Sequence, residues 1–211
     1  MTAPLSGRKA QAARNDRLIV EAAREVFVAD PTAPVSAVAE RAGVGISALY
    51  RRYPSKEDLL RKLCADGLHL YTTIVEKAVE DLGDPWTAFE TYMRDVVDAD
   101  THSITLALAG TFKPSPELYE MSERAGRANR ALMARVHEAG VVRTDLDAAD
   151  LGALFEQLAA LQVDDPARTR DLRQRYLTII LDGLHTPATT TPLPGEPPTL
   201  SERGKRWALR L

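Results

Sequence analysis

The sequence predicts an all-α protein with an N-terminal three-helix helix-turn-helix domain and a C-terminal helical domain. Apolar residues recur at helical spacing through most of the chain, and strand-like alternation bounded by turns is almost absent. Proline and glycine divide this pattern into segments of helical length. In addition, the stretch AGVGISALYRRYPSKEDLL (42–60) has the spacing of two short helices joined by a tight turn.

The N-terminal part is expected to begin with a flexible basic arm at residues 1–13. The helix-turn-helix domain then covers residues 14–55. Its first helix runs over 14–28, where apolar side chains lie on one helical face. Pro31 and Pro34 interrupt this helix, because proline removes a backbone donor and clashes with the preceding turn.

The second and third helices are predicted at 35–42 and 46–53. Ala39 is small where the two helices approach each other, and Leu49 turns inward. Between them, Gly43 can adopt the left-handed conformation that ends a helix. The outward face of the third helix is therefore free to lie in a DNA major groove.

A helical body is expected over residues 56–185. Its helices are predicted at 56–81, 86–98, 103–112, 116–139, 148–163 and 166–184. Ser55 caps the first of these helices, with Glu57 and Asp58 in its first turn, where acidic side chains favour the helix dipole. Asp147 caps the fifth.

A proline-rich tail is expected from residue 186 to residue 211. The stretch TPATTTPLPGEPPT (186–199) has five prolines and cannot hold a helix. The basic segment LSERGKRWALRL (200–211) is either a frayed tail or a short docking helix, and we expect a disordered tail.

Composition indicates a soluble protein, since 211 residues with 45% hydrophobic and 27% charged side chains can bury a core. No apolar run approaches the roughly 20 residues that a membrane helix needs, and the N-terminus lacks the apolar segment of a secretory signal. The single cysteine, Cys64, excludes an internal disulfide and suits a reducing compartment. We therefore expect a cytoplasmic protein with no membrane partner.

Charge is unevenly distributed along the chain. Residues 1–53 carry eight basic and five acidic side chains, a net charge of +3, which leaves −6 for the remainder because the total is −3. A basic head on an acidic body is typical of a DNA-binding module joined to a domain with a different ligand. An uneven scatter of solvated charges would give the same sum.

These segments resemble the TetR family of one-component transcriptional regulators. The resemblance is strong over about the first 60 residues and continues only as a helical pattern after them. Besides the first helix it rests on VSAVAERAGVG (35–45), ISALYRRY (46–53) and PSKEDLL (54–60), whose most distinctive run is Leu49-Tyr50, Tyr53 and Ser55-Lys56-Glu57. Three positions depart from the family pattern, where cap or aromatic residues are usual: Pro34, Gly45 and Arg52.

The resemblance implies which residues contact DNA. Tyr50 and Lys56 match a tyrosine and a lysine that bind DNA phosphates in the family, and Arg52 stands where a further phosphate contact is expected. The start of the third helix, which points at base edges in this motif, consists of Gly45, Ile46, Ser47 and Ala48.

Two further positions stay open between roles. Arg51 either forks onto a guanine edge or neutralises a phosphate. Ser36, in the first turn of the second helix, either binds a phosphate or satisfies the end of that helix.

The resemblance also implies a ligand cavity among the helices of the body. Large and soft side chains cluster after residue 60, and an apolar cavity with few polar groups suits a small, largely apolar effector. The candidate ligand-binding residues are His69, Trp86, Phe89, Met93 and Phe112. For each of them the alternative is ordinary core packing.

The last two long helices are expected to form a homodimer. Apolar residues cover more of each helix than one intramolecular contact needs, and small residues between them allow close approach. A symmetric four-helix bundle between two chains would bury both faces. It would also set two recognition helices in successive major grooves, roughly 34–36 Å apart in B-DNA.

Neither an enzyme nor a metal centre is expected. The four histidines never pair at i, i+4, and no serine has an obvious histidine and acid partner. Asp98, Asp100 and His102 are the only cluster with ligand-like residue types, and a solvated loop explains them better than a metal site. A glycine-rich phosphate loop is also missing, so no cofactor is predicted.

The sequence thus predicts a TetR-like regulator, most simply a repressor that a small molecule releases from a pseudo-palindromic operator in double-stranded DNA. The helix that begins at Lys56 is the expected lever, because its start touches DNA and its middle passes the cavity. Two alternatives are a ligand-independent DNA-binding regulator and a helical small-molecule-binding protein or enzyme that retains the head domain.

Overall fold

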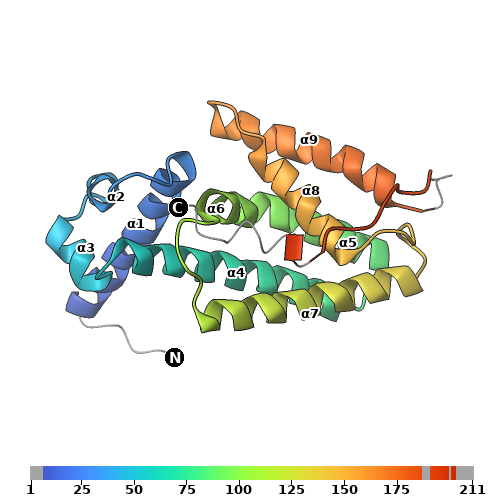
Figure 1. Cartoon of the computed structure of the whole chain (residues 1–211), viewed down its shortest axis with the longest axis horizontal. Helices are drawn as coiled ribbons and strands as arrows, with labels where there is room; N and C mark the ends of the chain where they lie inside the picture. Colours follow the sequence, from blue (N-terminus) through green and yellow to red (C-terminus); the bar gives the residue numbers. More distant parts are fainter. Residues whose placement is uncertain (1–6, 187–190, 200, 203–211) are drawn as a thin grey trace.

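The computed structural model describes residues 7–186, 191–199 and 201–202. Within these ranges the chain forms nine α-helices: α1 (Gly7–Ala29), α2 (Val35–Ala42), α3 (Ile46–Arg52), α4 (Lys56–Glu80), α5 (Pro85–Ala99), α6 (Thr101–Leu108), α7 (Pro116–Glu138), α8 (Ala148–Ala160) and α9 (Pro166–Leu184). The β-type pairing in the same ranges is an isolated bridge between Val142 and His185. The predicted all-α class is therefore confirmed (Figure 1).

Helices α1 to α3, the head of the molecule, pack into one core with the start of α4 and with Ile104 and Leu108 of α6. Ile19, Phe27, Val38 and Leu49 are fully buried there, together with Leu59 from the start of α4. Helices α2 and α3 have only eight and seven residues, too few to be stable alone. Their burial against α1 and α4 therefore holds them in place.

The turn between α2 and α3 has the geometry that the sequence predicts. Gly43 has a φ of 65°, in the left-handed region, and its N–H bonds to the carbonyls of Ala39 and Glu40. The N–H of Val44 returns to the same Ala39 carbonyl at 3.0 Å. A side chain at position 43 would strain this backbone, which is why glycine suits the turn.

Helix α4 connects the head to the rest of the molecule. Its start is capped by Ser55, whose hydroxyl accepts the N–H of Asp58 at 3.0 Å, as predicted. The helix then runs for 25 residues, beside α7 for much of its length, into the far end of the body (Figure 1). Its later residues Tyr71 and Val75 belong to the core of the body.

Helices α5 to α9 complete the body around α4. The predicted cap of α8 is present as a capping box, in which Asp147 accepts the N–H of Ala149 and Asp150 accepts the N–H of Asp147. Helix α9 buries Leu177 and Leu181 and leaves other apolar side chains outside. None of the described helices combines the length and the apolar character needed to cross a membrane.

Three helices, α1, α6 and α8, have boundaries that differ from the predicted ones by more than one residue. Helix α1 begins at Gly7, so residues 7–13 are helical rather than a flexible arm, in a stretch rich in good helix formers. Helix α6 starts at Thr101 and ends at Leu108, where Gly110 has a φ of 76° and turns the chain. Helix α8 ends at Ala160, three residues earlier than expected.

The proline-rich segment 191–199 has no helix, as its composition predicts. It is fastened to the loop between α7 and α8 at two points. Arg143 donates to the carbonyl of Thr191 at 2.7 Å, and Asp145 accepts the N–H of Leu193 at 2.9 Å. Residues 1–6 of the predicted arm, and the Trp207 segment for which a frayed tail and a docking helix stayed open, lie outside the described residues.

Candidate nucleic-acid interface and body cavity

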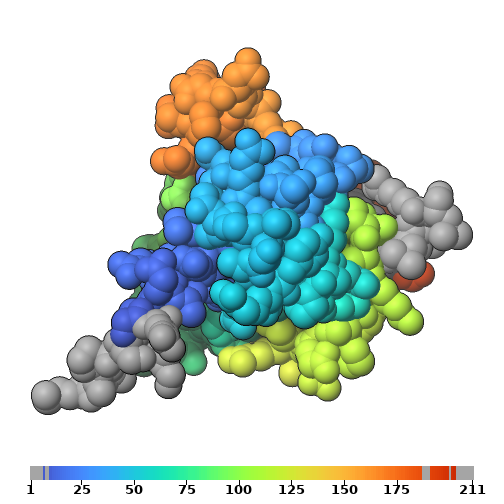
Figure 2. Space-filling model, turned by 90° about the vertical axis from the view of Figure 1, so that its left-hand side faces the viewer, coloured from blue at the N-terminus to red at the C-terminus, as the bar shows by residue number. Residues whose placement is uncertain are grey.

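The end of the head presents the residues that the sequence assigns to DNA contact. Figure 2 looks at this end of the molecule and shows α2 and α3 near the centre of the face. Seven of the nine residues predicted to contact DNA are exposed: Ser36, Gly45, Ile46, Ser47, Tyr50, Arg51 and Arg52. Ala48 is half-buried. The ninth predicted residue, Lys56, is half-buried. Sequence spacing therefore placed this surface correctly on the outside of the head.

Tyr50 and Arg51 are the most available polar side chains on this surface. Neither forms a hydrogen bond or an ion pair with any residue in the described part of the chain. Gly45 and Pro34, the residues before α3 and α2, give no side-chain cap. The N–H groups of Ala37 and Ala48 bond back to the carbonyls of Pro34 and Gly45, so only the N–H groups of the first two residues of each helix are left for other acceptors.

Arg52, by contrast, is held by Asp16 of α1. Its guanidinium donates to the Asp16 carboxylate at 2.6 and 3.3 Å, and the buried Tyr53 hydroxyl donates to the same group at 2.7 Å. The hydrogen bond from Arg52 lowers the pKa of Asp16, whereas burial and the bond to Asp16 raise the pKa of Tyr53. Arg52 thus fastens the end of α3 to α1.

Lys56 is also engaged inside the head. Its ammonium donates to the carbonyl oxygens of Pro31 and Ala33 at 3.0 and 2.7 Å, and it lies 4.9 Å from the centre of the Phe27 ring. Loss of hydration in this position lowers the pKa of Lys56. The side chain ties the loop between α1 and α2 to the start of α4, and one of its three N–H groups is left for another acceptor.

The body contains a cavity of about 350 Å³ between α4, α6, α7 and α8. Small residues from facing helices leave the space: Gly67, Ala109, Ala125, Gly126 and Gly152. Aromatic and carboxylate groups face it as well, among them Tyr71, His102, Tyr119, Glu123 and Glu156. Cys64 is also in the lining, and burial raises the pKa of its thiol to about 12, so the thiol is protonated and unreactive near neutral pH.

Hydrogen bonds form a closed ring beside this cavity. The Tyr92 hydroxyl donates to the side-chain oxygen of Asn129 at 3.0 Å, and the Asn129 amide donates to the Tyr71 hydroxyl. The two hydroxyls are 3.0 Å apart, so Tyr71 donates to Tyr92 and completes the circuit. Tyr92 is fully buried, and its pKa is raised well above the ordinary value because the phenolate would lose hydration.

The five residues predicted to bind ligand do not line this cavity. Phe89 and Met93 are fully buried core residues, and Trp86 stacks on His185 with ring centres 3.9 Å apart. His69 is exposed on α4, and Phe112 lies in the core shared by the head and the body. Large apolar side chains such as Phe89 and Met93 fill the core of the body, whereas the cavity is left where small residues face one another.

In the cluster of Asp98, Asp100 and His102 at the junction of α5 and α6, both carboxylates bind other side chains of the protein. Within the described ranges no group of three or more His, Cys, Asp or Glu side chains is placed to hold an ion. Asp100 is ion paired with Arg24 and Arg173.

Comparison with known proteins matches two family descriptions to this chain. The description "Bacterial regulatory proteins, tetR family" matches residues 19–63. The description "Transcriptional regulator SbtR-like, C-terminal domain" matches residues 84–186. The two matches cover the head with the start of α4, and the body from α5 onward.

Individual relatives agree with these matches. The HTH-type transcriptional repressor LfrR of Mycolicibacterium smegmatis is 34% identical over 110 residues, which span 50% of this chain and only 56% of the relative. A TetR transcriptional regulator of Streptomyces coelicolor superposes with a TM-score of 0.58 and 26% identity, over 82% of this chain and 99% of that one. The structure of LfrR from Mycobacterium smegmatis in complex with proflavine has the same fold, with a TM-score of 0.57 and 22% identity over 85% of this chain and 99% of that one.

An exposed second helix in a helix-turn-helix head, mounted on a helical body, defines a transcriptional regulator of the helix-turn-helix class. Within that class, the matched sequence segments and the shared fold identify a single family. The chain belongs to the TetR family of bacterial regulatory proteins.

We predict that Asp16→Ala lowers the free energy of unfolding by about 1–2 kcal/mol, because the buried Tyr53 hydroxyl loses its acceptor, while the exposed Arg52 contributes little. Urea denaturation followed by circular dichroism measures this difference. The pKa of Asp16 is lowered in the fold, so its contribution is present above the unfolded-state pKa and is lost as the pH falls through the folded-state pKa. Wild type and variant should therefore converge in acid.

The control for this prediction is Asp164→Ala, which removes an exposed carboxylate in the loop before α9. Equal stability of Asp16→Ala and Asp164→Ala at neutral pH would show that the Asp16 hydrogen bonds do not hold the head together.

Proposed function

We propose that the chain is a homodimeric, cytoplasmic TetR-family repressor that binds a pseudo-palindromic operator in double-stranded DNA and is released by a small molecule in the body cavity. The observation that carries this proposal is the exposed outer face of α3, where Tyr50 and Arg51 have no hydrogen-bond or ion-pair partner among the described residues, while Arg52 and Lys56 are committed to contacts inside the head. The exposed Tyr50 and Arg51 are then the groups that meet the DNA.

The chemistry of α3 supports binding that depends on both phosphate contacts and DNA shape. The Tyr50 hydroxyl and the Arg51 guanidinium are suited to phosphate oxygens, which set the register of the protein on the duplex. The residues at the start of α3, from Gly45 to Ala48, are small and offer few hydrogen bonds to bases. Selectivity would therefore draw on the shape of the DNA. Arg52 and Lys56 act in this proposal mainly by holding the head rigid.

The cavity supports a regulator that responds to a ligand. A body packed solidly with side chains would instead favour a DNA-binding regulator that needs no ligand. Its volume of about 350 Å³ falls within the range of small-molecule sites. The rings of Tyr71, His102 and Tyr119 suit a planar aromatic group, and the carboxylates of Glu123 and Glu156 suit hydrogen-bond donors on it. Because LfrR has been crystallised with proflavine, a planar aromatic amine, proflavine is a suitable first probe.

The outer face of α9 supports the homodimer. Tyr176 and Ile179 are 45% and 59% exposed, although both are large apolar side chains one turn apart. Leu172 lies on the same helical face, one turn earlier. A two-fold pairing of α8 and α9 with a second copy would cover this face.

We predict that Arg51→Ala weakens binding to an operator selected from a random DNA pool by about 1–3 kcal/mol and reduces the dependence of log Kd on log salt concentration by about one unit. Gel shift at several salt concentrations measures both quantities. The control is Arg127→Ala, which removes an exposed arginine of α7 in the body. Selection that yields no common site, or equal binding by both variants, would refute the DNA-binding role of α3.

We predict that Ser122→Trp weakens proflavine binding by at least about tenfold, because the indole occupies the mouth of a cavity that admits one drug-sized molecule. Fluorescence titration measures the affinity. Glu120→Trp adds the same side chain to an exposed position of α7 outside the cavity lining and should bind proflavine normally. Proflavine that fails to bind the wild type, or binds all three proteins equally, would contradict the ligand class or its location.

We predict that the double variant Tyr176→Glu, Ile179→Glu sediments as a monomer, because it places two charges in the expected apolar interface. Analytical ultracentrifugation gives the mass. Leu82→Glu is the matched control, since Leu82 is 98% exposed in the loop after α4 and should leave the dimer intact. A wild-type chain that is monomeric, or a double variant that stays dimeric, would exclude α9 as the interface.

A further inference from the structure

The turn between α5 and α6 is the strained point of the body. Asp100 ends α5 and precedes α6, and its φ is 50°. Within the described ranges, every other residue with a positive φ is a glycine. Left-handed backbone is unfavourable for residues with a side chain, although aspartate adopts it more readily than most. Such a conformation persists where surrounding contacts hold it, and those contacts point to a role.

The first contact comes from the head. Arg24 of α1 donates to the carbonyl oxygens of Ala99 and Asp100, at 3.0 and 2.5 Å, and lies 3.5 Å from the Asp100 carboxylate. These carbonyls are at the end of α5, where a helix leaves acceptors unsatisfied and favours a cation. Arg24 therefore adds polar contacts between the head and the body to the covalent connection through α4 and to the apolar packing of α6 in the core that contains the head.

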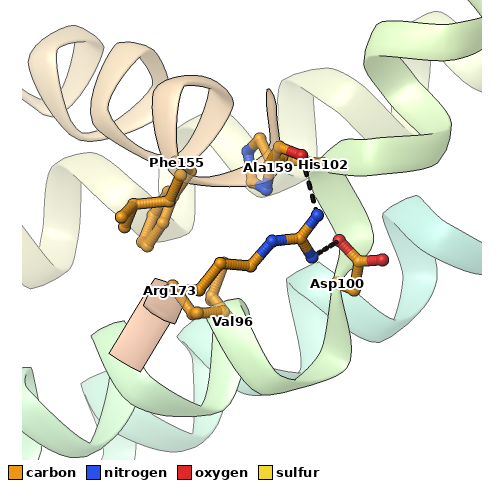
Figure 3. Close-up of a pocket in the computed structure, with 8 residues that line it drawn as sticks. Val96, Asp100, His102, Phe155, Ala159 and Arg173 are labelled. Carbon is orange, nitrogen blue, oxygen red and sulfur yellow. Dashed lines mark hydrogen bonds and ion pairs between the residues drawn. The ribbon is translucent and has the colours of Figure 1, made fainter. Parts of the chain in front are cut away.

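The second contact comes from α9. The Arg173 guanidinium donates to the Asp100 carboxylate at 2.7 Å and to the Ala159 carbonyl at 2.7 Å, so that Asp100 and the end of α8 share one cation (Figure 3). A further N–H of Arg173 goes to the carbonyl of Leu161 at 3.0 Å. Arg173 is buried, with 7% of its side chain exposed. Asp100 thus supplies the negative charge that a buried guanidinium needs.

The same turn is next to the body cavity. Helix α6 begins directly after Asp100, and its residues Thr101, His102 and Thr105 line the cavity. The His102 ring lies between Tyr71 and Phe155, with ring centres 5.4 and 5.0 Å away. A molecule that enters the cavity consequently meets the helix whose first turn is anchored at Asp100.

We propose that Asp100 is a joint that fixes the angle of the head against the base formed by α8 and α9. Arg173 of α9 binds Asp100 from the body, and Arg24 of α1 binds it from the head. A molecule in the cavity acts on Asp100 through α6. The link to the cavity rests on the proposed function, whereas the fixing of the angle does not. Unlike the α4 connection, the Arg24 contacts can break and form again without unfolding a helix.

The test measures the distance between head and body by double electron–electron resonance. Spin labels are placed at Ser47→Cys in α3 and Leu82→Cys after α4, both exposed, in a Cys64→Ala background. Labelled chains are mixed with an excess of unlabelled chains so that the distances measured are within one chain. The variant is Arg24→Met, which keeps the aliphatic stem and removes every donor.

The matched control is Arg124→Met, which removes an exposed arginine that donates to Glu76 at 2.7 and 2.8 Å and so joins α7 to α4 inside the body. Wild type and control should share one narrow distance distribution, and Arg24→Met should shift or broaden it. Asp100→Asn, which tolerates the left-handed backbone and removes the charge, should act in the same direction. An unchanged distribution in Arg24→Met would overturn the proposal.

A second readout separates the joint from the proposed function. With a selected operator, Arg24→Met should change the affinity of the protein for DNA by roughly tenfold, a size typical of coupling between sites, and Arg124→Met should not. The distance measurement needs no DNA and no ligand. A chain that binds no operator would therefore refute the proposed function and still leave the joint confirmed or refuted by its own result.

Discussion

Helix α4 takes part in both hydrophobic cores of the molecule and carries the covalent connection between them, so the placement of the head on the body depends on it. Leu59 and Leu60 of α4 are buried with the head, and Tyr71 and Val75 are buried with the body. A helix without proline bends little, so displacement of one end is passed to the other as a rigid movement. The head is packed at the start of α4, and the cavity is lined by residues from the middle of the same helix, from Cys64 to Tyr71.

The head keeps its shape by using cations that its fold class would otherwise offer to DNA. Arg52 is engaged by Asp16, and Lys56 gives two N–H groups to backbone carbonyls of the loop before α2. Both contacts hold the helix-turn-helix in one geometry before any partner arrives, which reduces the entropy that binding has to remove. Among the cations predicted to contact DNA, Arg51 is then the one without a partner in the described part of the chain.

Local signals predicted the helices well, because single residues determine where they begin and end. Gly43 and Ser55 set the boundaries around α3 and α4, and Asp147 sets the start of α8. Residues 7–13 misled the prediction, since their basic charge suggested an arm although their composition favours helix. The pairing of Arg52 with Asp16, 36 positions away, follows from the packing of α3 on α1 and has no signature in sequence spacing. The cavity was predicted for the body, but its lining residues were missed for a similar reason: the lining depends on which small residues face one another across four helices.

The ring of hydrogen bonds formed by Tyr71, Tyr92 and Asn129 can run in either direction, and the orientation of the Asn129 amide selects one of them. An amide donates through nitrogen and accepts through oxygen, so the two hydroxyl protons follow the direction that Asn129 sets. The three dipoles therefore reverse only together, when the amide turns over. A guest whose own dipole opposes the ring would have to turn the whole circuit over, which makes polarity, beyond size alone, a basis for discrimination among molecules that enter the cavity.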